Sequence, residues 1–311
     1  MESTVVEVEP DRSGERLDRF LSERLGVSRA RVRHLLEVGR VSCAGRPLAL
    51  SDKSHRTAPG DRFEVGGSLR AEDERPLARP DLDWRLVAEG EGWLVVDKPA
   101  ACGVHPLRPD QDETVLNAVV ARRPEILGVG EGGLRSGVVH RLDVDTTGAL
   151  LFATDDAHWK RLRGAFIDHR AVKRYVALVA GRFEKARRVD LELSITRHHP
   201  AHVTVVTGQG HPSRQYVRPI EVLPDATYVE VKLETGFLHQ IRATMAHLGH
   251  PILGDREYGG SDHATWLEVP RPMLHAAKLS VDEIDVEVPL PADFVALLER
   301  LRGPEGPGNS S

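Results

Sequence analysis

The chain of 311 residues has little cysteine and no long apolar run. Its two cysteines, Cys43 and Cys102, lie far apart and form no CxxC or Cys/His cluster, so neither a disulfide framework nor a zinc site is indicated. The N-terminus is acidic where a secretory signal needs a basic and then an apolar segment. No stretch is apolar over the length of a membrane span. We therefore expect a cytoplasmic protein without a membrane partner.

Nucleotide-binding signatures are also expected to be missing. We expect no P-loop and no GxGxxG dinucleotide fingerprint. We therefore expect a reaction that needs no nucleotide or other cofactor.

Basic residues are not in excess, because the formal net charge is −5. Affinity for phosphate depends on local rather than total charge, and residues 16–40 are locally positive. Their arginines are Arg16, Arg19, Arg24, Arg29, Arg31, Arg33 and Arg40, against Asp18, Glu23 and Glu37. This pattern is typical either of a solvated helical face or of a surface that contacts nucleic acid.

Residues 1–67 have the pattern of a small unit with two helices. Apolar residues recur at steps of three and four before Gly26, and Ser28 is suited to cap a second helix that ends at Gly39. Short strands are expected at 40–42 and 63–65. Residues 68–84 are charged and proline-containing, which is typical of an exposed linker.

A second domain is expected over residues 85–300, followed by a disordered tail at 301–311. Helices are predicted at 114–121, 156–167, 239–248 and 292–301. Strands are predicted at 93–97, 137–142, 149–154, 175–180, 189–195, 203–206, 228–233 and, with breaks, 276–288. Many strands with few helices between them predict an α+β fold on a mixed or antiparallel sheet.

The segment GVVHRLDVDTTGALLFA, residues 137–153, places Asp143 between two apolar stretches. If residues 137–142 form a strand, Arg141 and Asp143 share one face and His140 and Leu142 the other. A carboxylate on a rigidly braced loop suits catalysis. The alternative is an ordinary turn rich in turn-forming residues.

Two further segments carry polar groups at the ends of apolar elements. In LETGFLHQIRATMAHLGHPILGD, His239 and Arg242 lie three residues apart on a predicted helix, where the arginine would pair with a buried carboxylate and hold it ionised. Tyr175 begins the predicted strand YVALVAG, where its ring would stack on a base or simply be half-buried.

Taken together, HRLDVDTTG, KRYVALV, TGFLHQIR with AHLGHPILGD, and RPMLHAAKL resemble the ordered motifs of the RluA family of pseudouridine synthases. WLVVDKPAACGVHP resembles the opening segment of that family. Residues 1–67 resemble the S4-like RNA-binding domain, which often precedes such a synthase domain and which favours RNA contact for Arg29 and Arg33.

The resemblance implies a role for each matching residue. Asp143 matches the essential aspartate, Tyr175 the tyrosine that stacks on the target base, and Arg242 the basic partner of the aspartate. Arg141 matches the arginine that replaces the extruded base in the RNA stack. Leu274 lies in a late apolar pocket motif, and we expect His140 and His239 to contact RNA. Phe237 and Leu238 depart from the family pattern, which puts one RNA backbone contact in doubt.

The implied activity is isomerisation of uridine to pseudouridine in structured RNA by a monomer. Large-subunit ribosomal RNA is the expected substrate, and transfer RNA is an alternative. A catalytically silent RNA-binding assembly factor is a rival, but such a protein would not require Asp143, Tyr175 and Arg242 together. A metal site at Asp143 and Asp145 is a further rival, disfavoured because no other ligand is suitably spaced.

Overall fold

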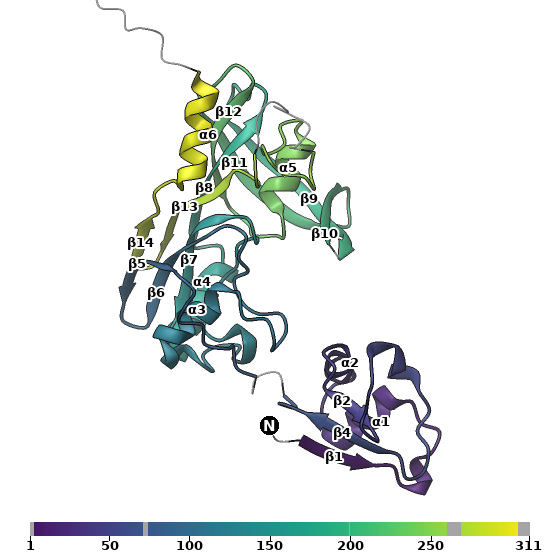
Figure 1. The fold of residues 1–311 in the computed structure, drawn as a ribbon. Coiled ribbons are helices and arrows are strands. Elements are labelled where there is room, and N and C mark those ends of the chain that lie inside the picture. The colour runs from purple at the N-terminus through teal and green to yellow at the C-terminus, as the bar shows by residue number, and fades with distance from the viewer. Residues whose placement is uncertain (1–2, 71–73, 199, 260–268, 304–311) are drawn as a thin grey trace, which may run out of the picture.

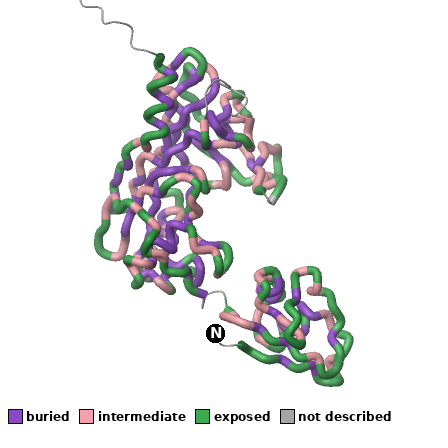
Figure 2. Tube along the Cα trace, in the orientation of Figure 1, coloured by how far each residue is buried: buried purple, intermediate pink, exposed green. Residues whose placement is uncertain are grey.

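The computed structural model describes residues 3–70, 74–198, 200–259 and 269–303. These residues form two units with separate hydrophobic cores, one built from residues up to Leu69 and one from residues after Asp83 (Figures 1 and 2). The expected tail falls largely on residues 304–311, outside the described residues.

The N-terminal unit packs two helices on a small antiparallel sheet of order β1-β4-β2-β3. Its elements are β1 (Ser3–Glu7), α1 (Leu17–Leu25), α2 (Arg29–Glu37), β2 (Val41–Cys43), β3 (Arg46–Pro47) and β4 (Arg62–Gly66). Gly26 ends α1 at φ 65°, a left-handed conformation that suits glycine. The Ser28 hydroxyl accepts from the Arg31 N–H, which begins α2 as predicted.

The expected linker is held at both ends. Arg31 of α2 donates to the carbonyls of Ser68 and Leu69 and pairs with Glu74. Nearer the second unit, the buried Asn117 side chain donates to the Leu77 carbonyl at 2.8 Å. The expected exposed linker over 68–84 is thus bound through its backbone by side chains of both units.

The second unit is built on one large mixed sheet of order β10-β9-β11-β12-β8-β13-β7-β6-β5, with β14 beside β13. Its strands are β5 (Arg85–Gly90), β6 (Trp93–Lys98), β7 (Thr147–Ala153), β8 (Val172–Ala180), β9 (Arg187–His198), β10 (Ala201–Val206), β11 (His211–Val222), β12 (Ala226–Leu233), β13 (Leu274–Val281) and β14 (Ile284–Glu287). Within the described residues the pairing is antiparallel except between β13 and β7. The α+β class is confirmed.

Helices lie close to where their periodicity predicts them. They are α3 (Val115–Arg122), α4 (Asp156–Ile167), α5 (Gln240–His247) and α6 (Ala292–Arg302). Apolar side chains from α3, α5 and α6 join the main core with the central strands. None of the helices in the described ranges is long and apolar enough to cross a membrane.

One predicted strand is absent, and one long strand was not predicted. Residues 137–142 are not a strand: Val138 makes one isolated bridge to Phe152, and the strand begins only at Thr147. The long strand β11 was missed because Pro212 and Pro219 suggest turns. In β11 the register shifts just after Pro219, which accommodates a residue without an N–H.

We predict that the second unit folds without the first, provided that residues 76–83 remain. A chain beginning at Pro76 should keep the melting temperature of the second unit. A chain beginning at Trp84 should lose about 1–3 kcal/mol, because the buried Asn117 amide then lacks its acceptor. Thermal melts of the two truncated chains test this, and equal melting temperatures would contradict it.

Candidate active site

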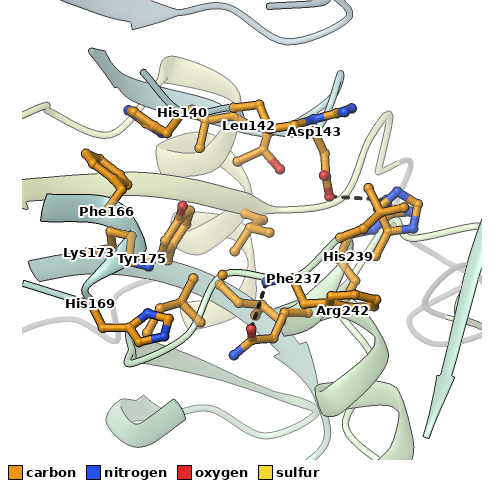
Figure 3. Close-up of a pocket in the computed structure, with 18 of the residues that line it drawn as sticks. His140, Leu142, Asp143, Phe166, His169, Lys173, Tyr175, Phe237, His239 and Arg242 are labelled. Atoms are coloured by element: carbon orange, nitrogen blue, oxygen red, sulfur yellow. Dashed lines mark hydrogen bonds and ion pairs between the residues drawn. The ribbon is translucent and has the colours of Figure 1, made fainter. Parts of the chain in front are cut away.

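A pocket of about 570 Å³ opens between the loop before β7, the start of β8 and the start of α5 (Figure 3). Its size is typical of a small-molecule site. Of the residues that the structure describes, those in the lining include apolar side chains and a single carboxylate, that of Asp143. The predicted site residues that line it are His140, Arg141, Asp143, Tyr175, His239, Arg242 and Leu274.

Arg242 connects two carboxylates at the edge of this pocket. Its Nε and Nη2 donate to both oxygens of the fully buried Asp255 at 2.6 and 2.9 Å, and its Nη1 lies 3.4 Å from Asp143 Oδ2. Burial by itself would lower the pKa of Arg242, but the hydrogen bonds and charge of Asp255, with the charge of Asp143, raise it above the usual range. The guanidinium is therefore a fixed positive partner for the Asp143 carboxylate.

Tyr175 lies within the pocket wall on β8. The residue is buried, with 8% of its surface exposed. Burial, and then the negative charge of Asp143, raise the pKa of the Tyr175 hydroxyl above its usual value. The phenol therefore stays protonated at neutral pH and presents a hydroxyl donor and a flat ring.

His239 is held in an unusual backbone conformation just before α5. Its φ is 52°, a left-handed value that is uncommon for residues other than glycine. Tyr258 accepts from the Val203 N–H at 2.9 Å and meets His239 Nδ1 at 3.0 Å. If Tyr258 donates to Nδ1, the neutral His239 ring carries its proton on Nε2.

His140 and Arg141 precede Asp143 and differ in environment. His140 Nε2 accepts from the Leu151 N–H at 3.0 Å, and its ring stacks on Phe166. Burial lowers the pKa of His140 to about 3, with smaller effects from nearby cations, so the ring is neutral. Arg141 is exposed beside the carboxylate.

The loop that carries Asp143 is held through its backbone, which the sequence did not indicate. The buried Lys98 donates to the carbonyls of Val144 and Thr146 at 2.7 and 2.9 Å. Arg271 donates to the Asp145 carbonyl at 3.2 Å and is itself fixed by a bidentate pair with Asp293. Two buried cations therefore set the conformation of the loop.

Phe237 and Leu238, which depart from the family pattern, pack against an apolar cluster that includes Leu193 and Val203. Phe237 also stacks on His211, with ring centroids 4.8 Å apart. An arginine at 237 would therefore lose this packing instead of simply adding a phosphate contact.

The N-terminal arginines gather around a buried acid. Arg16, Arg29 and Arg33 lie 3.1, 2.8 and 3.2 Å from the oxygens of Asp18, whose side chain is fully buried. Burial opposes ionisation of Asp18, but the three hydrogen-bonded guanidiniums lower its pKa well below the usual range. Three positive charges against one negative leave a net charge of +2 at this cluster.

Two kinds of cofactor site bear on the function: a metal-ligating cluster and a glycine-rich dinucleotide-binding turn. In the described ranges, no group of three or more His, Cys, Asp or Glu side chains could hold a metal ion. The expectation that the GxGxxG spacing is absent was wrong, because Gly128, Gly130 and Gly133 have it. They lead into the short 3-10 helix Gly133–Arg135 and not into an α-helix whose N-terminus could bind a pyrophosphate.

We predict that Asp255→Asn destabilises the second unit by about 3–5 kcal/mol, because the buried Arg242 then loses the charge of its bidentate partner. Asp190→Asn is the matched control, because Asp190 pairs with Arg188 at the surface, where such pairs contribute about 0–1 kcal/mol. Denaturant unfolding of both variants measures the difference, and equal stabilities would refute the prediction.

Comparison with known proteins identifies the family. Residues 92–247 match the family model described as RNA pseudouridylate synthase. An uncharacterized RNA pseudouridine synthase of Chloroflexus aurantiacus is 35% identical over 97% of this chain and 94% of its own. Ribosomal large subunit pseudouridine synthase D of Pseudomonas aeruginosa is 35% identical over 95% of both chains.

A solved structure agrees with these relatives. Human RNA pseudouridylate synthase domain containing 1 superimposes with a TM-score of 0.55 at 25% identity, over 73% of this chain and 97% of its own. The chain belongs to the RNA pseudouridylate synthase family, of the RluA type, and is an isomerase that converts uridine in RNA to pseudouridine.

Proposed function

We propose that Asp143 is the catalytic carboxylate of this isomerisation. The observation that supports this most is its position: within the described part of the chain it is the single acidic group lining the pocket, and it lies 3.4 Å from the fixed Arg242. Pseudouridine forms when the bond from the sugar to N1 of uracil breaks and a bond to C5 replaces it. The carboxylate either attacks the sugar or removes a sugar proton, and both first steps need its charge.

We further propose that Tyr175 stacks on the target base and that Arg242 orients Asp143. The buried ring of Tyr175 supplies an apolar face, and Leu274 at the start of β13 adds an apolar contact. Such a pocket offsets the cost of removing a uridine from its stack, which is a few kcal/mol.

RNA contacts outside the base pocket are assigned to exposed or polar groups at its edge. Arg141 is exposed beside Asp143 and is suited to fill the gap left by the extruded base. His239 presents Nε2 beside the start of α5. His140 retains only its second nitrogen for RNA, because Nε2 already accepts from the backbone.

We propose large-subunit ribosomal RNA as the substrate. The full-length similarity to the Pseudomonas aeruginosa enzyme named for that subunit supports this choice, and transfer RNA is the alternative. We also propose that the enzyme acts as a monomer. A ribosomal RNA substrate would place the enzyme in the cytoplasm.

We propose that residues 1–67, extended to Glu74 by the contacts of Arg31, form an S4-like RNA-binding domain. The support is the cluster around Asp18, where Arg29 and Arg33 remain about half exposed and carry excess positive charge. Exposed guanidiniums that are already oriented by a carboxylate suit phosphate binding.

Asp143→Asn should abolish modification while RNA binding is retained, because the amide keeps the shape of the side chain but not its charge. We would supply a gene-deletion strain with the wild-type, Asp143→Asn or Asp145→Asn gene and map pseudouridines by carbodiimide adducts and primer extension. The wild-type and Asp145→Asn genes should restore a site in large-subunit ribosomal RNA. Restoration by Asp143→Asn would refute the catalytic role, and restoration only in transfer RNA would refute the substrate.

Replacing Arg29 and Arg33 by glutamine should weaken binding to long RNA and make it less sensitive to salt. Removing one arginine–phosphate interaction should reduce the slope of log affinity against log salt by about 0.7–0.9. Turnover of a short saturating RNA should not change. Glutamine at Arg46, an exposed arginine outside the cluster, is the matched control. An unchanged slope in the double variant would remove these arginines from the RNA interface.

A further inference from the structure

Lys173 is a buried cation in the pocket that the roles above leave unused. Only 8% of the residue is exposed, and it lines the pocket with Tyr175 and Asp143. Within the part of the chain that the structure describes, its Nζ has one hydrogen bond, a donation to the Thr235 carbonyl at 3.2 Å. An ammonium group can donate three. Two donor positions are therefore left for another partner.

Among the residues that the structure describes, no carboxylate forms an ion pair with this lysine. The one acidic side chain that these residues contribute to the pocket lining is Asp143, which is paired with Arg242. Burying an ammonium without a carboxylate is unfavourable, and support of the Thr235 carbonyl requires only a neutral donor. The arrangement is therefore better suited to an anion that is present during the reaction.

The location of Lys173 places its amine beside the proposed base-binding ring. Lys173 and Tyr175 are two residues apart on β8 and so share one face of the strand. In Figure 3 they lie together on one side of the pocket, with Asp143 and Arg242 on the other. Gly236 also lines the pocket, and a Cβ on it would lie 3.5 Å from Nζ. A larger residue at that position would cover the amine.

The reaction generates an anion in this space. When the bond between C1′ and N1 breaks, its electron pair stays with uracil, and the charge spreads over N1 and the two carbonyl oxygens. This holds whether Asp143 attacks the sugar or removes a sugar proton. C5 then bonds to the sugar. This step displaces the Asp143 carboxylate if it had attacked the sugar, or is accompanied by return of the sugar proton if Asp143 had removed it. The C5 proton leaves and N1 gains a proton, so the overall change is an isomerisation.

We propose that Lys173 is a further catalytic residue, whose ammonium group hydrogen-bonds a carbonyl oxygen of the uracil and stabilises the uracil anion released from the sugar. The proposal rests on the proposed site at Asp143. Positive groups aimed at the atoms where charge develops are among the strongest contributors to catalysis.

The ionisation of the groups around Lys173 supports this role at neutral pH. Burial lowers the pKa of Lys173 to about 8, so the amine is still mostly protonated at pH 7. The residues paired with it on β12 and β13 are Leu233 and Leu279, which carry no charge.

The other titratable groups lining the pocket are His140, Arg141, Asp143, Arg163, His169, Tyr175, His239 and Arg242. His140, with a pKa of about 3, stays neutral above pH 7, and burial keeps the Tyr175 hydroxyl protonated. The rate should therefore fall as the pH rises through about 8, where Lys173 loses its charge.

The test compares Lys173→Met and Lys173→Arg with the wild type in single-turnover reactions at saturating RNA. Methionine keeps the buried chain but removes the charge, so the rate constant should fall about 10- to 100-fold with RNA affinity unchanged. Arginine should restore part of the rate and move the alkaline decline to higher pH. Lys185→Met is the matched control, because Lys185 is exposed beyond the opposite end of β8. A folded Lys173→Met enzyme with the wild-type rate would overturn the proposal.

RNA that contains 5-fluorouridine distinguishes two roles for Lys173: stabilising the uracil anion, and removing the C5 proton. The fluorinated base has no C5 proton, so only the first role can affect its conversion. The Lys173→Met defect should persist in the conversion of that base to its carbon-linked isomer. Disappearance of the defect would show that Lys173 is the base at C5 and would refute the proposal. A wild-type enzyme inactive on uridine, or an active Asp143→Asn variant, would instead indicate failure of the proposed function.

Discussion

The site depends on one guanidinium shared by two carboxylates. Asp255 is fully buried and takes the Nε and Nη2 edge of Arg242, which leaves Nη1 directed at Asp143. A lysine could not serve both acids in this way, because its ammonium is a point charge without a planar fork. Since Arg242 lies on α5 and Asp143 on the loop before β7, this interaction fixes the position of the helix relative to the sheet.

The charged groups around the pocket fall into two sets: some bind the backbone of the loop, and others line the pocket. Lys98 and Arg271 are buried and direct their donors at backbone carbonyls of the loop. The way in which Lys98 and Arg271 stabilise the loop conformation therefore does not depend on the side chains of the loop. Asp143 is left as the loop's acid in the pocket, opposite the donors that β8 supplies. The fold thus separates the groups that hold the loop from those that line the pocket.

Much of this could be predicted from the sequence, because local patterns determine helices and caps. The periodic segment Asp156–Ile167 is a helix with the predicted ends, and the pairing of Arg242 with Asp143 follows the expectation from the motifs. Residues 137–142 were misassigned because their apolar run is buried by packing without sheet pairing. The partnership of Asp255 with Arg242 was not predictable, because the rest of α5 and a turn lie between them and only the fold brings them together.

The contacts that hold the linker at Glu74 and Leu77 limit how far the two units can separate while both are bound to it. Glu74 is tied to the N-terminal unit and Leu77 to the second, with only Arg75 and Pro76 between them. At about 3.8 Å per residue, the Cα atoms of Glu74 and Leu77 can be no more than about 11 Å apart. If both units bind RNA as proposed, an RNA held by one unit would meet the other at an effective concentration in about the millimolar range. Weak contacts in each unit would then combine into strong binding, so neither unit would have to bind tightly alone.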